Sequence, residues 1–308
     1  MGFRFARLRL ALLLSLSLLG SAACRSAPAP AAKAPEEAPR STPGLFLYEV
    51  RGAAGATHLL GTIHVGFGFE EVLTADARAR FQASTRVMTE ADVATTDPEH
   101  LIQAALLPPE RSLRAILGEP SWSKLRERLR AQLPAPMLDR LEPWLPAVMI
   151  GLQDLEKALA ELKPNGQNRM MDVELVKQAS ALGKDLSYLE TVAEQLAIFD
   201  AISLEEQVRE LQQELEADSA RNARALLTSF AAGDEEALAS ALFEDATSAP
   251  GFYDRVLFER NERWLPVIER EVARGGAFIA VGAAHLLGPR GLLAELVKRG
   301  YEVRRVGG

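Results

Sequence analysis

The sequence has little of two residue types that often carry chemistry, with one cysteine and four histidines among 308 residues. The single cysteine, Cys24, excludes a disulfide within the chain, and its place near the N-terminus excludes a thiol nucleophile in the folded region. The sequence also lacks the H-E-x-x-H, G-x-S-x-G and Walker-type phosphate-loop motifs. It therefore carries no signature of the common zinc proteases, serine hydrolases or P-loop proteins, and the histidines become the main candidates.

Basic residues are fewer than acidic ones, 35 against 42. The formal net charge is −7, and removing the three arginines of the N-terminal segment (Arg4, Arg7 and Arg9) leaves −7 − 3 = −10. An acidic protein without a basic stripe is poorly suited to bind a phosphate backbone. We therefore expect no nucleic-acid partner.

The N-terminal segment, residues 1–24, has the organisation of a secretory signal peptide. A basic start precedes an apolar core at residues 10–19, which is too short to span a bilayer, and small residues follow. Cys24 comes directly after them, which resembles a bacterial lipoprotein signal whose cysteine becomes the lipidated N-terminus. Ser21 stands where leucine is usual in such signals. The residue directly after Cys24 is Arg25 and not an aspartate, which resembles the signal for sorting to the outer membrane in such lipoproteins. The alternative is ordinary signal cleavage with Cys24 incidental.

We therefore expect an exported protein of the bacterial cell envelope, held at the outer membrane only by a lipid anchor and facing the periplasm. Residues 25–44 are rich in Pro, Ala and Ser and have few large apolar side chains. That composition predicts a disordered tether, which lets a folded domain stand away from the membrane. The folded domain is expected over residues 45–308, a length that suits one large domain or a domain with an insertion.

Within this domain, predicted strands cluster at the two ends and helices lie between them. Apolar runs predict strands at residues 45–50, 58–64, 85–90, 185–189, 278–281 and 301–306. Glycines at residues 52–55 predict a hairpin turn, and helical spacing is found at residues 74–84 and 289–299 and over most of residues 97–274. We expect an α/β fold with a central mixed sheet built from the N- and C-terminal segments and a large helical insertion at about residues 97–274.

Two short segments, GTIHVG and GAAHLLG, share one pattern. Each ends an apolar run with Gly-x-x-His and then another glycine, at His64 and His285. This pattern predicts a buried strand that leaves the sheet at a tight turn, where open α/β sheets place their ligands. The two histidines can therefore meet at one site although 285 − 64 = 221 positions separate them. The alternative is that each is a hydrogen-bonded structural residue, as we interpret His58 and His100, which are structural or solvated.

Glu90 closes the third predicted strand. If this strand lies beside the first Gly-x-x-His strand, Glu90 and His64 emerge at the same sheet edge. With His285 they would form a divalent-metal set that leaves positions open for water and substrate. Such a metal lowers the pKa of bound water and polarises a carbonyl. The alternative is a solvated carboxylate at a strand end.

Three further residues are candidates for supporting roles. Glu190 follows the short inner strand and could supply a second carboxylate for acid–base chemistry. Equally, Thr191 and Glu194 could simply begin a helix as N-cap and third helical residue. Arg260 and Asn261 precede the last Gly-x-x-His strand and could bind a carbonyl or carboxylate, or could lie on an exposed helix face.

The ordered set of these motifs resembles the TraB/GumN family, which includes the TIKI-type metalloproteases. The matching segments are residues 60–66, Glu90, residues 143–144, residues 189–191 with Gln195, Arg260 and Asn261 with Trp264 and Ile268, residues 281–288, residues 291–292 and residues 300–303. The resemblance covers nearly all of the mature domain and implies an α/β fold related to the erythromycin-esterase and ChaN-like group. It also implies a divalent metal ion, manganese, cobalt or zinc, at the two Gly-x-x-His histidines and the family's glutamate.

Carried over by residue, the resemblance points to His64, Glu90 and His285 as metal ligands, with supporting positions at Glu190, Arg260 and Asn261. One departure concerns the family's Gly-apolar-Asp near the middle of the chain, where Met170-Met171-Asp172 lacks the glycine. The aspartate remains, but the family's local backbone and a substrate contact at this point are not carried over to this sequence.

The leading hypothesis is a metal-dependent hydrolase of the cell envelope, acting on a peptide or protein substrate. His64, His285 and Glu90 would hold the metal and its water, and Glu190 would serve as base or as a partner of a ligand. Arg260 and Asn261 would orient the substrate or stabilise the oxyanion. The rival hypothesis is a non-catalytic envelope lipoprotein that binds a peptide or a metal ion.

Overall fold

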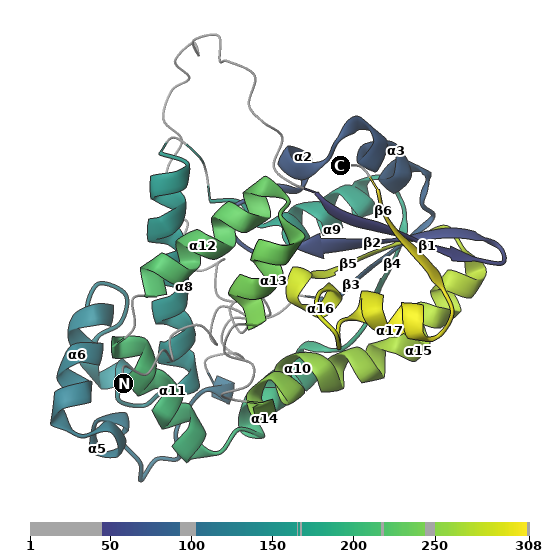
Figure 1. Cartoon of the computed structure of the whole chain (residues 1–308). Helices are drawn as coiled ribbons and strands as arrows, with labels where there is room; N and C mark the ends of the chain where they lie inside the picture. Colours follow the sequence, from purple (N-terminus) through teal and green to yellow (C-terminus); the bar gives the residue numbers. More distant parts are fainter. Residues whose placement is uncertain are drawn as a thin grey trace.

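The computed structural model describes residues 45–92, 103–164, 166, 168–216, 219–243 and 250–306. The expected signal peptide, the tether, Cys24 and His100 lie outside these ranges. The described chain forms a sheet covered by helices, with a helical part beside one end of it (Figure 1).

The sheet contains the strands expected from the sequence. The strands are β1 (Phe46–Gly52), β2 (Gly55–Thr62), β3 (Arg86–Thr89), β4 (Asp185–Tyr188), β5 (Ala277–Gly282) and β6 (Glu302–Val306). They form one six-stranded sheet in the order β4-β3-β5-β2-β1-β6. β1 pairs antiparallel with β2 and β6, whereas β2, β5, β3 and β4 run parallel to one another. The sheet is therefore mixed and built from both ends of the domain, as expected.

Two details of the sheet bear on the site. The predicted hairpin joins β1 to β2, with Gly52 paired to Gly55. The condition considered above, that the Glu90 strand lies beside the first Gly-x-x-His strand, is not met, because β3 pairs with β5. β5 lies between β3 and β2, and this order places Glu90 closer to the second Gly-x-x-His segment.

Helices cover both faces of the sheet (Figure 1). They are α2 (Phe69–Val72), α3 (Ala75–Ala83) and α9 (Met171–Ala181) on one face, and α15 (Glu259–Arg274), α17 (Leu292–Lys298) and the short α16 (Ala283–Leu286) toward the other. Thr74 caps α3 as expected, since its hydroxyl accepts from the Ala77 amide. Aromatic rings fill the core beneath α2 and α3, where Phe81 lies 4.9 Å from Phe69 and 5.2 Å from Phe278 between ring centroids.

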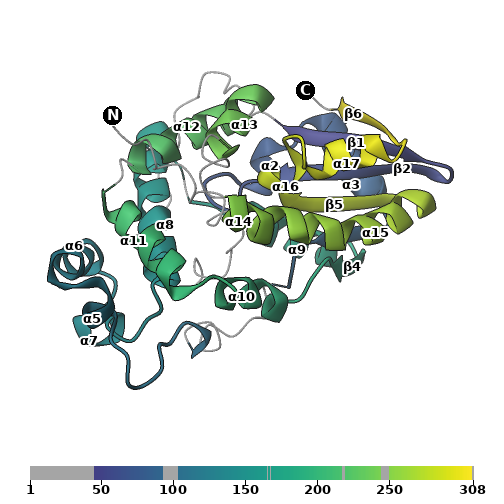
Figure 2. The ribbon, with the colours of Figure 1, turned by 60° about the horizontal axis from the view of Figure 1, so that its bottom comes forward.

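The segments between β3 and β5 that do not cover the sheet form the helical part (Figure 2). It comprises α5 (Leu113–Leu117), α6 (Glu119–Leu129), α7 (Ala135–Leu138), α8 (Trp144–Leu162), α10 (Val192–Asp200), α11 (Leu204–Glu216), α12 (Ser219–Ala232), α13 (Glu235–Phe243), α14 (Pro250–Tyr253) and the π-helical turn η1 (Asp254–Phe258). α8 is its centre and contacts α6, α11 and α12. Over the described ranges, none of the helices combines the length and the apolar character needed to cross a membrane.

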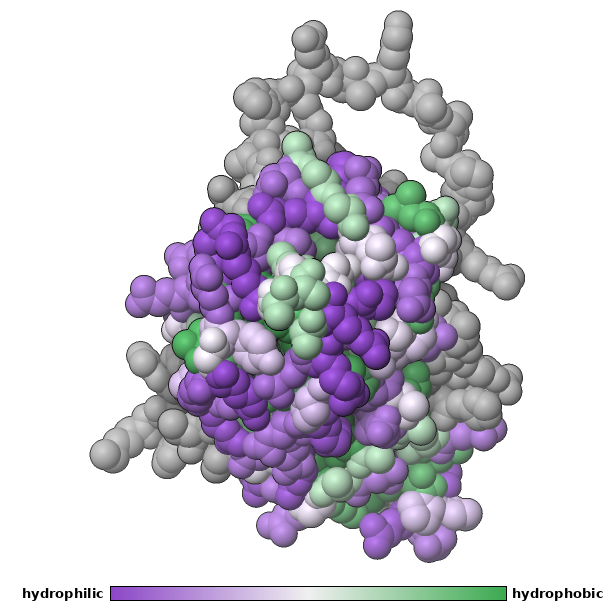
Figure 3. All heavy atoms as spheres, turned by 90° about the vertical axis from the view of Figure 1, so that its right-hand side faces the viewer, coloured by the Kyte–Doolittle hydropathy of each residue, from purple (hydrophilic) through white to green (hydrophobic). Residues whose placement is uncertain are grey.

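The two ends of the sheet differ. β2 starts at the hairpin and runs toward the helical part, and β5 and β3 run parallel to it, so that their carboxyl ends face the helices (Figures 1 and 2). The opposite end, which carries the hairpin, shows a mostly hydrophilic surface with small separated apolar patches (Figure 3). The side chains that follow β2, β3 and β5 therefore lie between the sheet and the helical part, where α/β sheets place their ligands.

Candidate functional site

The two Gly-x-x-His segments lie side by side on neighbouring parallel strands. In the register of β2 and β5, Thr62 pairs with Gly282, so the two motifs are offset by a single residue. His64 follows the end of β2, and His285 lies in α16 directly after β5. The glycine that follows each histidine has a positive φ, 107° at Gly66 and 83° at Gly288. L side chains rarely adopt such angles, and this explains why a glycine follows the histidine in both segments.

His64 is held by a buried aspartate. Its Nδ1 lies 2.6 Å from Asp172 Oδ2, and the hydroxyl of Thr62 donates to Asp172 Oδ1 at 2.9 Å. Because an ionised carboxylate only accepts, Nδ1 carries the proton, and Nε2 is the atom through which His64 would take a proton or bind a ligand. Burial by itself would lower the pKa of His64, but the charge and hydrogen bond of Asp172 outweigh it and raise the pKa.

His285 has the opposite environment. The amide of Asn261 donates to the carbonyl of His285 at 3.1 Å, and its Oδ1 faces His285 Nδ1 at 2.8 Å. This orientation of the amide makes Nδ1 the donor, and Nε2 accepts from Arg260 Nη1 at 3.0 Å. Burial, the charge of Arg260 and the charge of His64 hold the pKa of His285 well below its ordinary value. His285 is therefore a neutral imidazole with both nitrogens engaged.

Arg260 connects the remaining predicted residues. It has no exposed surface and donates from Nη2 to Glu90 Oε2 at 2.7 Å and to Glu190 Oε1 at 2.6 Å. Its Nε donates to both oxygens of Glu190, at 3.1 and 3.3 Å. Glu90 accepts a further bond through Oε1, from the Gly282 amide at 2.7 Å. A buried ion cluster of this kind is tolerated because each charge has hydrogen-bonded partners.

The two histidines share one electrostatic environment. The charges of Glu90 and Arg260 both act on the pKa of His64, and the charge of His64 acts on the pKa of His285. All of these side chains are buried between the sheet and the helical part. The structure thus brings the predicted set together from opposite ends of the chain.

The alternatives left open by the sequence are decided differently for each residue. Glu90, Arg260 and Asn261 are buried, so they belong neither to a solvated strand end nor to an exposed helix face. For Glu190 the helix start is confirmed, because Thr191 and Glu194 form a capping box on α10. Glu190 itself is buried and contacts Arg260, and its acid–base role stays a prediction.

His58 lies away from this cluster. Its Nε2 contacts Arg80 Nη1 at 3.0 Å and lies 3.7 Å from a carboxylate oxygen of Glu49. These contacts agree with its interpretation as a structural residue.

Two members of the cluster, Asp172 and Thr62, were absent from the predicted site residues. Asp172 lies in the first turn of α9, where it reaches His64 from a segment 108 positions away. The family's Gly-apolar-Asp element was the signal that could have found it. The missing glycine has no backbone consequence, because Met170 has φ −112° and ψ 101°, ordinary extended angles.

The cluster contains the donor types of a divalent-metal site but not its arrangement. Among the described residues, no group of three or more His, Cys, Asp or Glu side chains could hold a metal ion. His285 Nε2 and Glu90 Oε1 are 3.8 Å apart, within the spacing of about 3–4 Å expected for ligands of one small cation. Arg260 donates to both of these residues, and its guanidinium occupies the place of the cation. The predicted set of His64, Glu90 and His285 therefore does not fit a metal in this arrangement.

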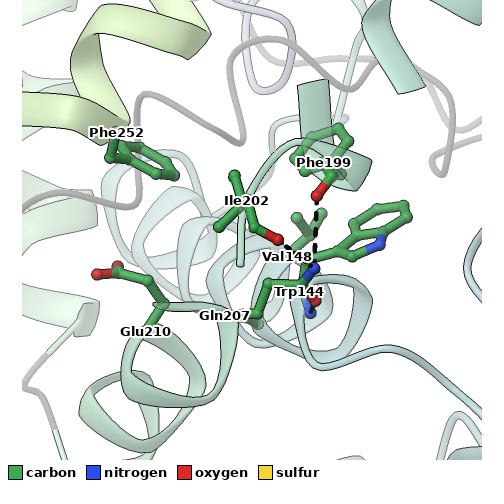
Figure 4. A pocket seen from close by; sticks show the side chains of 8 residues that line it. Trp144, Val148, Phe199, Ile202, Gln207, Glu210 and Phe252 are labelled. Carbon is green, nitrogen blue, oxygen red and sulfur yellow. Dashed lines mark hydrogen bonds between the residues drawn. The ribbon is translucent and has the colours of Figure 1, made fainter. Parts of the chain in front are cut away.

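A separate apolar pocket lies in the helical part, lined by Trp144, Val148, Phe199, Ile202 and Phe252 among others (Figure 4). Its central polar side chain, Gln207, donates to the carbonyls of Phe199 and Ile202 and accepts from the Trp144 amide. Gln207 thus ties α8, α10 and α11 together. These bonds satisfy the side-chain amide of Gln207 within the wall of the pocket. Gln207 therefore stabilises the walls and is not a member of the cluster around Arg260.

Comparison with known proteins agrees with the motifs. The signature of the TraB/PrgY/gumN family matches residues 46–305. The chain is 24% identical, over 326 aligned positions, to a protein of Danio rerio named "Metalloprotease TIKI1". That alignment covers 86% of this chain and 64% of the relative, so the chain spans less than two thirds of its length. No solved structure matches the chain. Because the family signature extends over most of the chain, this protein belongs to the TraB/PrgY/gumN family.

Proposed function

We propose that the protein is a hydrolase that cleaves a peptide bond, with His64 as its general base. The observation that carries the proposal is the buried bond between His64 Nδ1 and Asp172 Oδ2, 2.6 Å long, beside two carboxylates and an arginine. A histidine oriented by an aspartate is the base of many acyl-transfer enzymes. The family membership and the name of the Danio rerio relative support a peptidase-like reaction.

The chemistry follows from the orientation of the ring. Asp172 fixes the proton on Nδ1, which leaves the lone pair on Nε2 to accept a proton from water. The resulting hydroxide forms the new bond to the carbonyl carbon. When the carbon–nitrogen bond breaks, the same proton passes from Nε2 to the leaving amine, so His64 returns to its neutral form.

The surrounding residues have positioning roles in this proposal. Asn261 and Arg260 hold His285 neutral and fixed, and Glu90 ties the amide of Gly282 to the cluster. We assign Arg260 the positive charge closest to a developing oxyanion, as its charge already acts on His64. Glu190 neutralises Arg260 and stays a partner of that residue.

The metal dependence expected from the sequence stays open to test. The relative's name supports it, whereas the arrangement around Arg260 does not fit a metal. A bound divalent ion would supply Lewis-acid polarisation of the carbonyl and an acidified water. The proton transfers proposed for His64 do not involve such an ion.

We also propose the location expected from the sequence, an exported lipoprotein anchored through Cys24. Its support is the order of basic start, short apolar core and small residues before Cys24.

The test is cleavage of a peptide library by the purified chain, by His64→Ala and by His285→Ala, each with chelator and with added Mn²⁺, Co²⁺ or Zn²⁺. The proposal expects cleavage that His64→Ala abolishes while the variant stays folded by circular dichroism. Peptide binding without turnover in every condition would instead favour the non-catalytic binding protein.

A further inference from the structure

One face of α10 connects the ion cluster around Arg260 to the apolar pocket. Glu190, which contacts Arg260, comes just before α10 begins at Val192. The buried residues of α10 are Gln195 and Phe199, and residues four apart lie on the same face of a helix. Phe199 lines the pocket. Gln195 therefore lies between the cluster and the pocket along this face, and α10 itself lies between the sheet and the helical part (Figure 2).

A second element makes the same connection. Phe252 of α14 lines the pocket across Ile202 from Phe199 (Figure 4). In the π-helical turn η1, 256 − 252 = 4 positions later, the carbonyl of Val256 accepts from Arg260 Nη1 at 3.0 Å. Such turns recur at functional sites. Both α10 and the segment formed by α14 and η1 therefore extend from the cluster to the pocket.

The pocket itself suits an apolar side chain. Its walls are aromatic and aliphatic, with Trp144 stacked on Phe199 at 4.3 Å between ring centroids. It measures about 400 Å³ with space open to solvent included, the small end of the range of about 300–1,000 Å³ for ligand pockets. That size fits a single side chain. The carboxylate of Glu210 in the wall and the net charge of −7 disfavour an anionic lipid tail.

Gln195 places an unsatisfied polar atom between the cluster and the pocket. The residue is only 3% exposed, and its Oε1 has no hydrogen-bond partner among the described residues. Buried side-chain oxygens are nearly always hydrogen-bonded, so one without a partner calls for an explanation. A backbone N–H of a peptide that lies along α10 would supply the missing donor.

We propose that the apolar pocket is a specificity subsite for an apolar side chain of a peptide substrate, and that a backbone N–H of the same peptide donates to Gln195 Oε1. The position of the cleaved bond, at the cluster around Arg260, rests on the proposed function. The pocket and Gln195 contribute binding and positioning and take no part in the proton transfers.

The two connecting elements set the spacing. Phe199 follows Glu190 by 199 − 190 = 9 positions, about 14 Å at the rise of a helix, whereas Phe252 and Val256 are about 6 Å apart along theirs. An extended peptide advances about 3.3 Å per residue. The apolar side chain should therefore be roughly two to four residues from the cleaved bond.

The test is calorimetric binding of blocked serine hexapeptides that carry one phenylalanine or leucine at each position in turn, compared with the all-serine hexapeptide. The full chain carries Asp172→Asn, which slows turnover during the titration. The best apolar hexapeptide should bind at least about tenfold more tightly than the all-serine one, the effect of burying one apolar side chain. Ala147→Leu, which adds bulk at a half-buried wall residue of the pocket, should abolish this gain.

Ala160→Leu is the matched control. Ala160 lies on α8 as Ala147 does, but it is exposed and does not line the pocket. Its affinity for every hexapeptide should stay within about twofold of the parent value, because a substitution away from the contact is nearly neutral.

Gln195 is tested by a double-mutant cycle with the peptide. Gln195→Leu should weaken binding of the best hexapeptide about fivefold, and N-methylation of one peptide nitrogen should do the same. Together they should cost no more than either alone, because both remove one hydrogen bond. Gln195→Glu, which keeps an acceptor oxygen, should retain the effect of N-methylation. If no position of the peptide shows this coupling, Gln195 is not the acceptor.

Equal affinities for the apolar and the all-serine hexapeptides would overturn the proposal, and so would a gain that survives in Ala147→Leu. If Ala147→Leu does not fold, Ala147→Val takes its place and should lose part of the gain. Decanoate that binds more tightly than every hexapeptide and is lost in Ala147→Leu would assign the pocket to an acyl chain and overturn the proposal as well.

The two proposals fail separately. Binding that selects an apolar residue, in a wild-type chain that cleaves no peptide, would keep this inference and reject the hydrolase. Cleavage that depends on His64 but shows no preference for an apolar residue near the cleaved bond would do the reverse. If both hold, Ala147→Leu should raise KM for the apolar hexapeptide and leave kcat unchanged.

Discussion

His64 and His285 occupy the same sequence pattern, but their pKa values are shifted in opposite directions. Asp172 raises the pKa of His64 against the effect of burial, whereas burial and Arg260 lower the pKa of His285. Two like groups whose environments separate their pKa values are typical of sites that divide acid–base roles. At the scale of residues, the proposed function therefore makes His64 the proton carrier, while His285 is a fixed neutral partner of Arg260.

Asp172→Asn tests the pair directly. The amide cannot hold the proton on Nδ1 as the carboxylate does, so turnover should fall by roughly 10³- to 10⁴-fold with the fold intact. Steady-state kinetics measure the loss, and Asp185→Asn, at an exposed aspartate, is the control. A loss below tenfold would mean that Asp172 does not orient a catalytic base.

The pH dependence follows from the direction of the pKa shift. Because the reaction needs unprotonated Nε2, and Asp172 raises the pKa of His64, kcat/KM should rise with pH through a midpoint above the ordinary histidine value of about 6.5. In Asp172→Asn the raising charge is gone and burial remains, so the midpoint should move down. A midpoint that stays in place would show that another group titrates.

For most of the site, the sequence allowed a prediction of which residues lie together. It did not allow a prediction of which side chain hydrogen-bonds to which. The repeated Gly-x-x-His pattern was enough to bring His64 and His285 together. Asp172 gave a weaker signal, because one aspartate in the first turn of a helix is an ordinary capping residue in the sequence. The position of Arg260 among the expected metal ligands depends on how the first turn of α15 packs against the sheet, which local spacing does not encode.

At the scale of elements, the strands were predictable and their order was not. Each strand is a short apolar run closed by glycines or polar residues, which a single sequence displays. The neighbour of β3 depends on contacts distant in sequence, and β5 rather than β2 took that place. The apolar runs closed by glycines thus predict at which edge of the sheet the site lies. The neighbours of each side chain follow only from the strand order in the structure.

The turn after β2 supplies a stability prediction. Gly66 has a φ of 107°, and a Cβ there would lie 3.1 Å from the Leu159 side chain of α8. Gly66→Ala should therefore lower the free energy of unfolding by about 1–3 kcal/mol, the cost of a strained backbone residue. Chemical denaturation measures the change.

Gly251→Ala is the control for that measurement. Gly251 has no positive φ, and a Cβ there meets nothing within 4 Å, so alanine should be neutral or stabilise by about 0.4–1 kcal/mol. If Gly66→Ala is as stable as the wild type, the turn does not need its glycine.

At the scale of the whole molecule, the cluster lies where the sheet meets the helical part. The carboxyl ends of the parallel strands face the helices, and the side chains of the site that follow these strands are buried. This placement excludes water from the ion cluster, where each charge–charge interaction is stronger than in solvent. His64 itself is only 3% exposed in this arrangement.

The proposed lipid anchor is tested on intact cells. If the thiol of Cys24 is the attachment point of the lipid, as proposed, Cys24→Ser should move the protein from the membrane fraction to the soluble periplasmic fraction. Fractionation and labelling with a radioactive fatty acid measure the change. A wild-type protein that takes up no label would reject the lipid anchor, whatever its location.

The most direct measurement of the central claim is peptide cleavage by the wild type, by His64→Ala and by Asp172→Asn under identical conditions. The account predicts cleavage by the wild type, a loss of at least about 10³-fold in both variants, and melting temperatures that show all three folded. Equal cleavage by a folded His64→Ala variant would contradict it.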